Sequence, residues 1–242
     1  MQRDLKALDA MPNLPTLFFN TAEAKKRKPF LWQKENGKYR SSTYRQTMQE
    51  VIQLARGLRD LGIEAGDRVV ICSENRPEWV IADIAIMALG AIAVPAYTTN
   101  TTTDHLHILS NSGAKGAIVS TRDLAKKLLP AAIDSGICQF ITSIEPLLIR
   151  QKLPLDVHAY DALIAHGKEL QDDIAKFARD LPRESTSCII YTSGTGGTPK
   201  GVELSHGAIL CNATGAFDVL IDGWSVGEEV FLSFLPMTHS YE

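Results

Sequence analysis

Cysteine is scarce in this sequence: four residues out of 242, spread widely along the chain. Cys72, Cys138, Cys188 and Cys211 form no Cys-x-x-Cys pair, and no histidine stands near them at the spacing of a zinc finger. This pattern argues against a disulfide framework and against a structural zinc site. We therefore expect buried structural thiols in a reducing compartment, which predicts a cytoplasmic chain.

Long hydrophobic runs are also missing. The N-terminal segment has no apolar stretch of the length that a secretory signal requires. The best membrane candidate runs from Trp79 to Tyr97, but Asp83, Gly90 and Pro95 interrupt it, and its uninterrupted part is far shorter than about 20 residues. The sequence thus predicts a soluble protein.

A strong charge of one sign is absent as well. The chain has 25 basic and 28 acidic side chains, a net charge of −3 and a pI near 6.1. Binding to nucleic acid draws on clustered Lys and Arg that neutralise phosphates, and the basic run at 25–28 is too short for that. We expect no nucleic-acid partner, while a nucleotide ligand stays open. The hydrophobic content of 45% is typical of a globular protein, so a packed core is expected.

The sequence does contain a regular alternation of short apolar runs with longer segments of helical periodicity. The apolar runs lie at 69–72, 91–94, 117–120 and 139–143. The helix after the first run is predicted to begin with Asn75 as its N-cap and Pro77 in its first turn, and to end at Gly90. Such an alternation predicts βαβ crossovers, and therefore an α/β fold with a largely parallel, twisted sheet flanked by helices.

Two local signals stand upstream of this alternation. Asn36-Gly37 separates two short strand-like segments, and that dipeptide readily takes the positive φ angles of a tight hairpin turn. Thr43 followed by Gln46 is typical of a capping box, and apolar residues at helical spacing behind it predict a helix over 44–61. We expect a β-hairpin followed directly by a helix.

A change of composition divides the chain. Between Leu153 and Asp180 the sequence becomes richer in charge and in helix-forming residues, and the polar stretch LPREST follows. At about 150 residues per domain, a chain of 242 residues forms one large or two small domains. We expect an N-terminal α/β subdomain at 1–180 and the start of a second, ligand-binding subdomain at 181–242.

A strand-like run at 188–191 leads into a segment rich in glycine and hydroxyl side chains. The ten residues 192–201 contain four hydroxyl side chains, four glycines and one lysine. Glycines let backbone N–H groups turn toward an anion, hydroxyls donate further hydrogen bonds, and the lysine adds a positive charge. This pattern predicts a polyphosphate-binding loop with these candidate contacts: Thr192, Ser193, Gly194, Thr195, Gly196, Gly197, Thr198 and Lys200.

The order of residues in this segment does not fit the two common phosphate loops. Counting from Gly194, a Walker loop requires glycine where Pro199 stands and Ser or Thr where Gly201 stands. The Gly-x-Gly-x-x-Gly fingerprint fails at the same proline, and a strand-like segment follows the loop instead of a helix. A P-loop NTPase or kinase is therefore disfavoured, and a flexible surface loop is the structural alternative.

Three motifs together resemble one family. The loop YTSGTGGTPKGVELSH is similar to the phosphate-binding signature of the adenylate-forming (AMP-binding) enzymes, except that Gly196 stands where the family more often has Ser or Thr. The stretch GLRDLGIEAGDRVVICSENRPEWV at 57–80 resembles the family's N-terminal region. FLSFLPMTHSYE at 231–242 resembles its next motif, and an apolar strand is expected there. The order of these three motifs along the chain is similar to that in the N-terminal portion of long-chain fatty acyl-CoA synthetases.

This resemblance implies ATP-dependent activation of a carboxylate. The acid attacks the α-phosphate of ATP to give an acyl adenylate, and the thiol of coenzyme A (CoA) then displaces AMP. The resemblance further implies that Lys200 offsets charge on the leaving pyrophosphate, that Thr192 contacts Mg²⁺, and that His239 lies near the acyl carboxylate and the adenine. A packing or capping role is expected for His206, and a structural one for the remaining histidines, His105, His107, His158 and His166.

Several alternatives stay open at this stage. Within the family, the alternatives are a fatty acyl-AMP ligase and an aryl or amino acid adenylating enzyme. An alternative outside the enzymes is a phosphate-binding fragment without catalysis. The family's later motifs, among them a Tyr-Gly-x-Thr-Glu segment and a C-terminal lysine, are not found in residues 1–242. We therefore expect 181–242 to be truncated and this polypeptide alone to make no acyl-CoA. The expected partners are small molecules (fatty acid, ATP and CoA), with oligomeric state and peripheral membrane contact left open.

Overall fold

The computed structural model of the chain describes residues 8, 10–192, 198–220 and 230–238. Its first elements are α2 (Leu14–Lys25), β1 (Pro29–Glu35), β2 (Lys38–Thr43) and α3 (Tyr44–Asp60). An alternating series follows: β3 (Arg68–Cys72), α4 (Pro77–Ala88), β4 (Ile92–Pro95), α5 (Thr102–Ser112), β5 (Gly116–Val119), α6 (Arg122–Ser135), β6 (Phe140–Ser143) and β7 (Asp156–Ala159). The chain continues with α7 (Tyr160–Glu169), α8 (Ile174–Arg179), β8 (Thr186–Thr192), β9 (Lys200–Ser205) and α9 (His206–Leu220).

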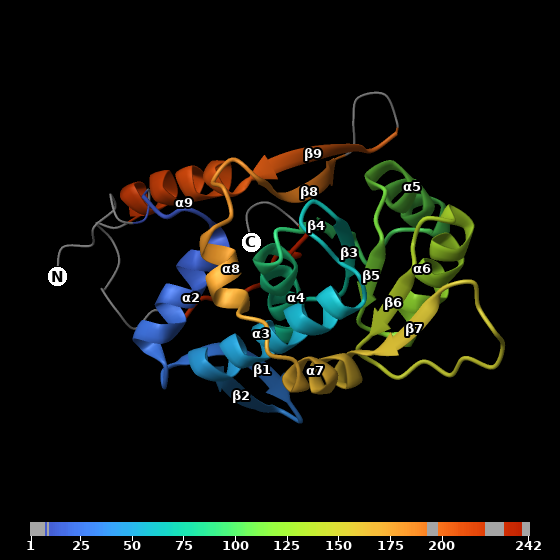
Figure 1. Cartoon of the computed structure of the whole chain (residues 1–242), viewed down its shortest axis with the longest axis horizontal. Helices are drawn as coiled ribbons and strands as arrows, with labels where there is room; N and C mark the ends of the chain where they lie inside the picture. Colours follow the sequence, from blue (N-terminus) through green and yellow to red (C-terminus); the bar gives the residue numbers. More distant parts are fainter. Residues whose placement is uncertain (1–7, 9, 193–197, 221–229, 239–242) are drawn as a thin grey trace.

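A seven-stranded sheet forms the centre of the molecule, in the strand order β7-β6-β5-β3-β4-β8-β9 (Figure 1). The neighbours from β7 to β8 pair in parallel, and β9 pairs with β8 in the antiparallel direction. Because β4 is added on one side of β3 and β5 on the other, the sheet is doubly wound. The predicted α/β fold with a largely parallel sheet flanked by helices is confirmed.

Helices cover both faces of this sheet because the side chains of a strand point alternately to its two sides. Val69 and Ile71 of β3 pack into a core with side chains of α2, α3, α4, α7 and α8. Val70 and Cys72 pack into a second core with side chains of α5 and α6. A central strand buried on both faces has to be apolar throughout, which explains the unbroken apolar run at 69–72.

The two local signals upstream of the sheet form the predicted structures. Asn36 and Gly37 have φ angles of 49° and 79° and connect β1 to β2, which pair in the antiparallel direction. The side chains and backbone N–H groups of Thr43 and Gln46 form both hydrogen bonds of a capping box. Helix α3 follows directly and ends within one residue of the predicted 44–61.

Helix α2 and strand β7 are not predicted from the sequence, and one expected element is wrong. β7 precedes the helices of the stretch 153–180; its polar sequence lies at the edge of the sheet, so no apolar run indicates it. In the segment 231–235, where we expected a strand, the described residues 230–238 contain none. Phe231, Leu232 and Phe234 are exposed there. A strand needs the backbone of a neighbouring strand for its hydrogen bonds, and a side chain holds this segment instead.

The start of α4 also differs from the prediction. Arg76 is the N-cap residue, without a hydrogen bond from its side chain to the first turn, and Pro77 is the first helical residue as predicted. The prediction of Asn75 as N-cap is therefore wrong. Its amide binds the segment 233–237 instead of the helix.

The predicted domain boundary at residue 180 falls in the link between α8 and β8. β8 joins β4 through the residue pair Ala93 and Cys188, so strands on both sides of the boundary belong to one sheet. The division into 1–180 and 181–242 stays a prediction. In the described part of the chain, no helix is both long and apolar enough to span a membrane.

Candidate functional site

The carboxyl ends of the parallel strands meet along one edge of the sheet, which is where open α/β folds bind ligands. β8 ends at this edge with Thr192, and β9 begins there with Lys200. The two residues lie directly opposite each other in the β8–β9 hairpin, and both are exposed. The hairpin therefore presents a hydroxyl and an ammonium group close together, one on each arm.

Part of the predicted phosphate loop belongs to the described residues. Thr192, Thr198 and Lys200 are described, and all three are exposed. The other candidates lie outside the described residues: Ser193, Gly194, Thr195, Gly196, Gly197 and His239. Their roles stay predictions.

Gly201 has a packing role that the motif alone does not reveal. A Cβ atom at this position would lie 2.7 Å from Cγ2 of Ile189 and 3.2 Å from Cζ of Tyr191. Both distances are shorter than ordinary carbon–carbon contacts in a packed interior, so a larger residue would displace these neighbours. The glycine after the lysine thus lets β9 lie close to the buried tyrosine of β8.

Helix α5 touches both arms of the hairpin. The Tyr191 hydroxyl donates a hydrogen bond to Oδ1 of Asn111 at 2.7 Å. On the other arm, Nε2 of His107 lies 2.8 Å from the carbonyl oxygen of Pro199 and donates to it, since a carbonyl oxygen only accepts. We expected a structural role for His107 from the sequence, and no local pattern marks this contact, because Pro199 is 92 positions further along the chain.

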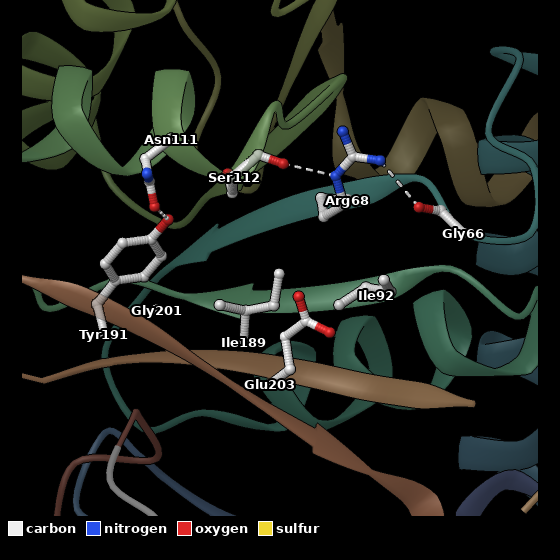
Figure 2. A pocket seen from close by; sticks show the side chains of 9 residues that line it. All are labelled: Gly66, Arg68, Ile92, Asn111, Ser112, Ile189, Tyr191, Gly201 and Glu203. Atoms are coloured by element: carbon white, nitrogen blue, oxygen red, sulfur yellow. Dashed lines mark hydrogen bonds between the residues drawn. The ribbon is translucent and has the colours of Figure 1, made fainter. Parts of the chain in front are cut away.

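A cavity of about 310 Å³ lies beside these contacts (Figure 2). Ile92 and Ile189 contribute apolar walls, while Arg68 and Glu203 bring opposite charges to it. Figure 2 shows the Arg68 guanidinium directed at backbone carbonyls; it donates at 2.6 to 2.9 Å to those of Ser112, Gly66 and Gly113. Because β3 and β4 begin at Arg68 and Ile92, the cavity extends toward the amino ends of these strands. It therefore extends from the loop end of the hairpin, where Tyr191 and Gly201 line it, into the interior of the protein, away from the exposed side chains of Thr192 and Lys200.

A tether crosses the carboxyl edge of the sheet. Asn75, just after β3, donates from Nδ2 to the carbonyl oxygen of Leu235 at 2.6 Å and to Oγ of Ser233 at 2.9 Å. Its Oδ1 accepts from the backbone N–H of Met237 at 3.0 Å. One amide side chain thus holds 233–237, the segment that precedes the predicted His239, at the edge where β8 also ends.

A second cavity, of about 470 Å³, lies where the strand order reverses, between the carboxyl ends of β3 and β5. Such a position is a frequent ligand site in doubly wound folds. Here, however, Lys126 pairs with Asp123 at 2.6 Å, and the carboxylate of Glu74 accepts a hydrogen bond from Ser120. Glu145 adds another carboxylate to the lining, so acidic side chains outnumber basic ones there and the hairpin is the better candidate for binding an anion.

Burial keeps several titratable groups of the sheet region neutral. It lowers the pKa of His105 and of His206 to about 4, so both imidazoles are uncharged at pH 7. It also raises the pKa of the Cys72 thiol to about 12, which makes the reactive thiolate rare. The expectation of buried thiols holds for Cys72, Cys138 and Cys188, whereas Cys211 is exposed on α9. Among the described residues, no three or more His, Cys, Asp or Glu side chains gather into a group that could hold a metal ion.

Comparisons with known sequences identify similar proteins. The family model of the AMP-binding enzymes matches residues 18–242. Long chain acyl-CoA synthetase 3 of Arabidopsis thaliana is 27% identical, over 99% of this chain and 38% of that protein. The chloroplastic long-chain-fatty-acid–[acyl-carrier-protein] ligase AEE15 of the same plant is 27% identical, over 83% of this chain and 28% of that protein. The rat (Rattus norvegicus) long-chain-fatty-acid–CoA ligase ACSBG1 is 28% identical, over 97% of this chain and 30% of that protein. The chain thus spans between 28% and 38% of the length of these relatives.

Solved structures share the fold. The A domain of the carboxylic acid reductase from Segniliparus rugosus, in complex with AMP and a co-purified carboxylic acid, matches with a TM-score of 0.77. That match has 18% identity and covers 98% of this chain and 44% of the other. The anthranilate CoA ligase AuaEII, in complex with anthranoyl-AMP, matches with a TM-score of 0.69 at 22% identity. This match covers 85% of this chain and 37% of the other. At these identities the likeness concerns the fold.

Proposed function

Because this chain belongs to the AMP-binding enzyme family, we propose that it takes part in the ATP-dependent activation of a long-chain fatty acid. In this proposal the fatty acid carboxylate attacks the α-phosphorus of ATP, the bond to the β-phosphate breaks, and pyrophosphate leaves. The thiol of CoA, after losing its proton, then attacks the acyl carbon of the adenylate, AMP leaves, and the thioester forms. The long-chain substrates in the names of the similar proteins support the choice of acid.

The observation that carries the proposal is the pairing of Thr192 with Lys200 across the β8–β9 hairpin at the carboxyl edge of the sheet. The exposed ammonium group of Lys200 is accessible to a triphosphate there. Negative charge moves onto the pyrophosphate as it leaves, and a cation held on a strand of the sheet offsets that charge without reorganising. Lys200 therefore acts in the first step of the reaction.

The hydroxyl of Thr192 is the protein ligand that we propose for Mg²⁺. A hard cation prefers oxygen donors, and the exposed hydroxyl at the end of β8 is such a donor. When bound, Mg²⁺ neutralises charge on the phosphate oxygens. Thr192 orients the ion relative to the hairpin, and the loop of hydroxyl residues and glycines at 193–198 binds the β- and γ-phosphates.

We assign His239 to the neighbourhood of the acyl carboxylate and the adenine. Support comes from the tether that Asn75 forms with 233–237, because this segment lies at the edge that also carries Lys200 and precedes His239 in the sequence. The hairpin and the segment 233–237 thereby lie at one edge of the sheet.

Product analysis tests the proposed reaction. Because residues 1–242 alone are expected to make no acyl-CoA, the intact protein in this assay is one that carries this chain together with the family's later motifs. It is supplied with ATP, Mg²⁺, CoA and one acid at a time: palmitate, acetate, benzoate or an amino acid. We expect AMP and pyrophosphate, with palmitate as the preferred acid. Formation of ADP would indicate phosphoryl transfer by a kinase, and turnover restricted to benzoate or an amino acid would contradict the long-chain assignment.

A carrier-protein thiol in place of CoA is the second candidate for the acceptor. The observation that favours it is the relative named for ligation to acyl carrier protein, at the same 27% identity as the acyl-CoA synthetase. The same assay with holo acyl carrier protein instead of CoA distinguishes the two acceptors. Acyl transfer to the carrier protein but not to CoA would replace our first choice of acceptor.

The variant Lys200→Ala tests the role of the lysine in the intact protein. A charge-assisted contact is worth roughly 1.5 to 3 kcal/mol, so we expect adenylate formation to slow by about 10- to 100-fold. Thioester formation from a supplied acyl adenylate should change little, because pyrophosphate has already left. Lys168→Ala, an exposed lysine on α7, is the matched control. Equal losses in both half-reactions would contradict a role confined to the first step.

A further inference from the structure

His107 and Asn111 stand four positions apart on α5 and therefore lie on the same face of this helix. Asn111 accepts a hydrogen bond from Tyr191, which is on the outgoing arm of the hairpin. His107 donates a hydrogen bond to Pro199, which is on the returning arm, one residue before Lys200. One face of one helix thus binds both ends of the predicted phosphate loop.

We propose that His107 and Asn111 are positioning residues for the phosphate loop, forming a clamp on α5 that fixes the two arms of its hairpin relative to the sheet. This inference rests on the proposed function, because it assigns these residues to the loop that binds the phosphates. The clamp acts through Tyr191 and Pro199, and neither His107 nor Asn111 needs to touch the ligand.

The attachment of the hairpin to the sheet shows why a clamp is needed. β8 is in register with β4 at one residue pair, Ala93 and Cys188, in the middle of β8. Among the described strands, β9 lies at the edge of the sheet and pairs with β8 alone. The ladder to β4 therefore leaves the loop end of the hairpin, with Thr192 and Lys200, to be held by other contacts.

The chemistry of the two contacts suits this role. The ring of Pro199 limits its φ angle, so the direction of its carbonyl group depends on its ψ angle alone. A hydrogen bond from His107 to that carbonyl therefore orients the backbone just before Lys200. The Tyr191 side chain is 6% exposed, and its ring meets the His107 ring edge to face with 6.0 Å between centroids. A hydrogen bond from a hydroxyl in this sheltered position is stronger than one in water.

The packing of α5 onto the sheet is carried by other residues. Ile108 and Leu109 are buried in the core formed with α6, with 4% and 0% of their surfaces exposed. His107 is only half-buried and Asn111 is exposed. Removing the clamp should therefore displace the hairpin much more than it affects the helix.

The experiment compares His107→Ala with His107→Gln, whose side-chain amide can still donate to Pro199, and with Tyr191→Phe, which loses only the hydroxyl. Ser110→Ala is the matched control, an exposed position on α5 between the two clamp residues. Binding of tripolyphosphate is measured by titration calorimetry on the full chain. A net hydrogen bond is worth about 1 kcal/mol, so we expect the affinity to fall about fivefold in His107→Ala and Tyr191→Phe. His107→Gln and Ser110→Ala should stay within about twofold of the wild type.

Hydrogen exchange without any phosphate separates the clamp from the proposed function. We expect faster exchange at 200–202 in His107→Ala, and unchanged exchange at 69–72 in the central strand. Absence of tripolyphosphate binding to the wild type would overturn the proposed phosphate site. Unchanged exchange at 200–202, or equal affinity losses in His107→Ala and His107→Gln, would overturn the clamp itself.

Discussion

Polar side chains show how a residue's role depends on partners that are distant in the sequence. Asn75 stands just before a proline-initiated helix, where short polar side chains usually cap, and its amide binds Leu235, 160 positions later. His107 carries no motif, and its ring binds Pro199. The type of each residue determines which hydrogen bonds its side chain can form. The fold decides which partner is within reach.

Asp83 on α4 provides a prediction at this scale. Burial raises its pKa to about 7, whereas an unfolded aspartate titrates near 3.9. Between about pH 4 and pH 7 the native state therefore holds a proton that the unfolded state has lost. The contribution of this proton to the free energy of unfolding is complete below about pH 4 and disappears as the pH rises to about 7. We expect the stability of the wild type relative to Asp83→Asn to fall by about 2 kcal/mol from pH 4 to pH 8, a value discounted for the partial exposure of Asp83.

Urea unfolding of both proteins at pH 4, 6 and 8 measures this difference. Asp134→Asn, an exposed carboxyl on α6, is the control and should show no such trend. The buried histidines titrate in the wild type and in both variants, so their contributions cancel in the comparison. A difference between wild type and Asp83→Asn that is constant over this range would contradict the raised pKa.

At the scale of the element, local rules predict how a helix starts, and close packing decides where it lies. The capping box of Thr43 and Gln46 starts α3 as the sequence predicts. The contact of α3 with α7 depends on glycine instead. A Cβ atom at Gly167 would lie 1.8 Å from the carbonyl oxygen of Gln53, and one at Gly57 would lie 2.8 Å from the Leu163 side chain. Two glycines thus allow the two helices to approach backbone to backbone.

Gly167→Ala should destabilise the protein, because the new methyl group meets rigid helix backbone. We expect a loss of about 3 kcal/mol in the free energy of unfolding. Gly215→Ala on α9 is the opposite case, since a Cβ there meets nothing within 4 Å. It should stabilise the helix by up to about 1 kcal/mol. Urea unfolding midpoints check both signs, and a Gly167→Ala variant as stable as the wild type would contradict this helix contact.

At the scale of the whole molecule, the strength of attachment decreases from the centre of the sheet to the hairpin that carries the predicted site. β3 has four residue pairs with each of its neighbours, β4 and β5, and its side chains enter both cores. The hairpin joins this centre through one residue pair of β8 and β4, and through side chains of β8 that are buried in the two cores: Cys188 in one, Ile189 and Tyr191 in the other. The central strands are thus held rigidly, and the hairpin that carries the predicted phosphate loop is attached to them less rigidly.

Native-state hydrogen exchange should reveal this gradient. Amides at 68–72 are expected to exchange only through global unfolding, because opening β3 disrupts both cores. Amides of β9 that bond to β8 should exchange through a smaller opening, with a free energy lower by about 2 kcal/mol or more. Exchange followed by mass spectrometry at low urea concentrations distinguishes the two, since a local opening depends weakly on denaturant. Identical opening energies would mean that the hairpin unfolds only with the whole sheet.

The sequence by itself determined the class of the fold and the composition of the candidate site. Apolar runs that alternate with helical periodicity, the capping box and the glycine-rich segment at 192–201 are all short-range patterns, and hydrophobic spacing and turn chemistry act over a few residues. Only the tertiary structure decided the strand order, the polar edge strand β7, the clamp of α5 on the hairpin and the tether of Asn75 to 233–237. These features join residues that are tens to more than a hundred positions apart. They form because both faces of the sheet must be buried at once, and burying both faces requires segments from the whole length of the chain.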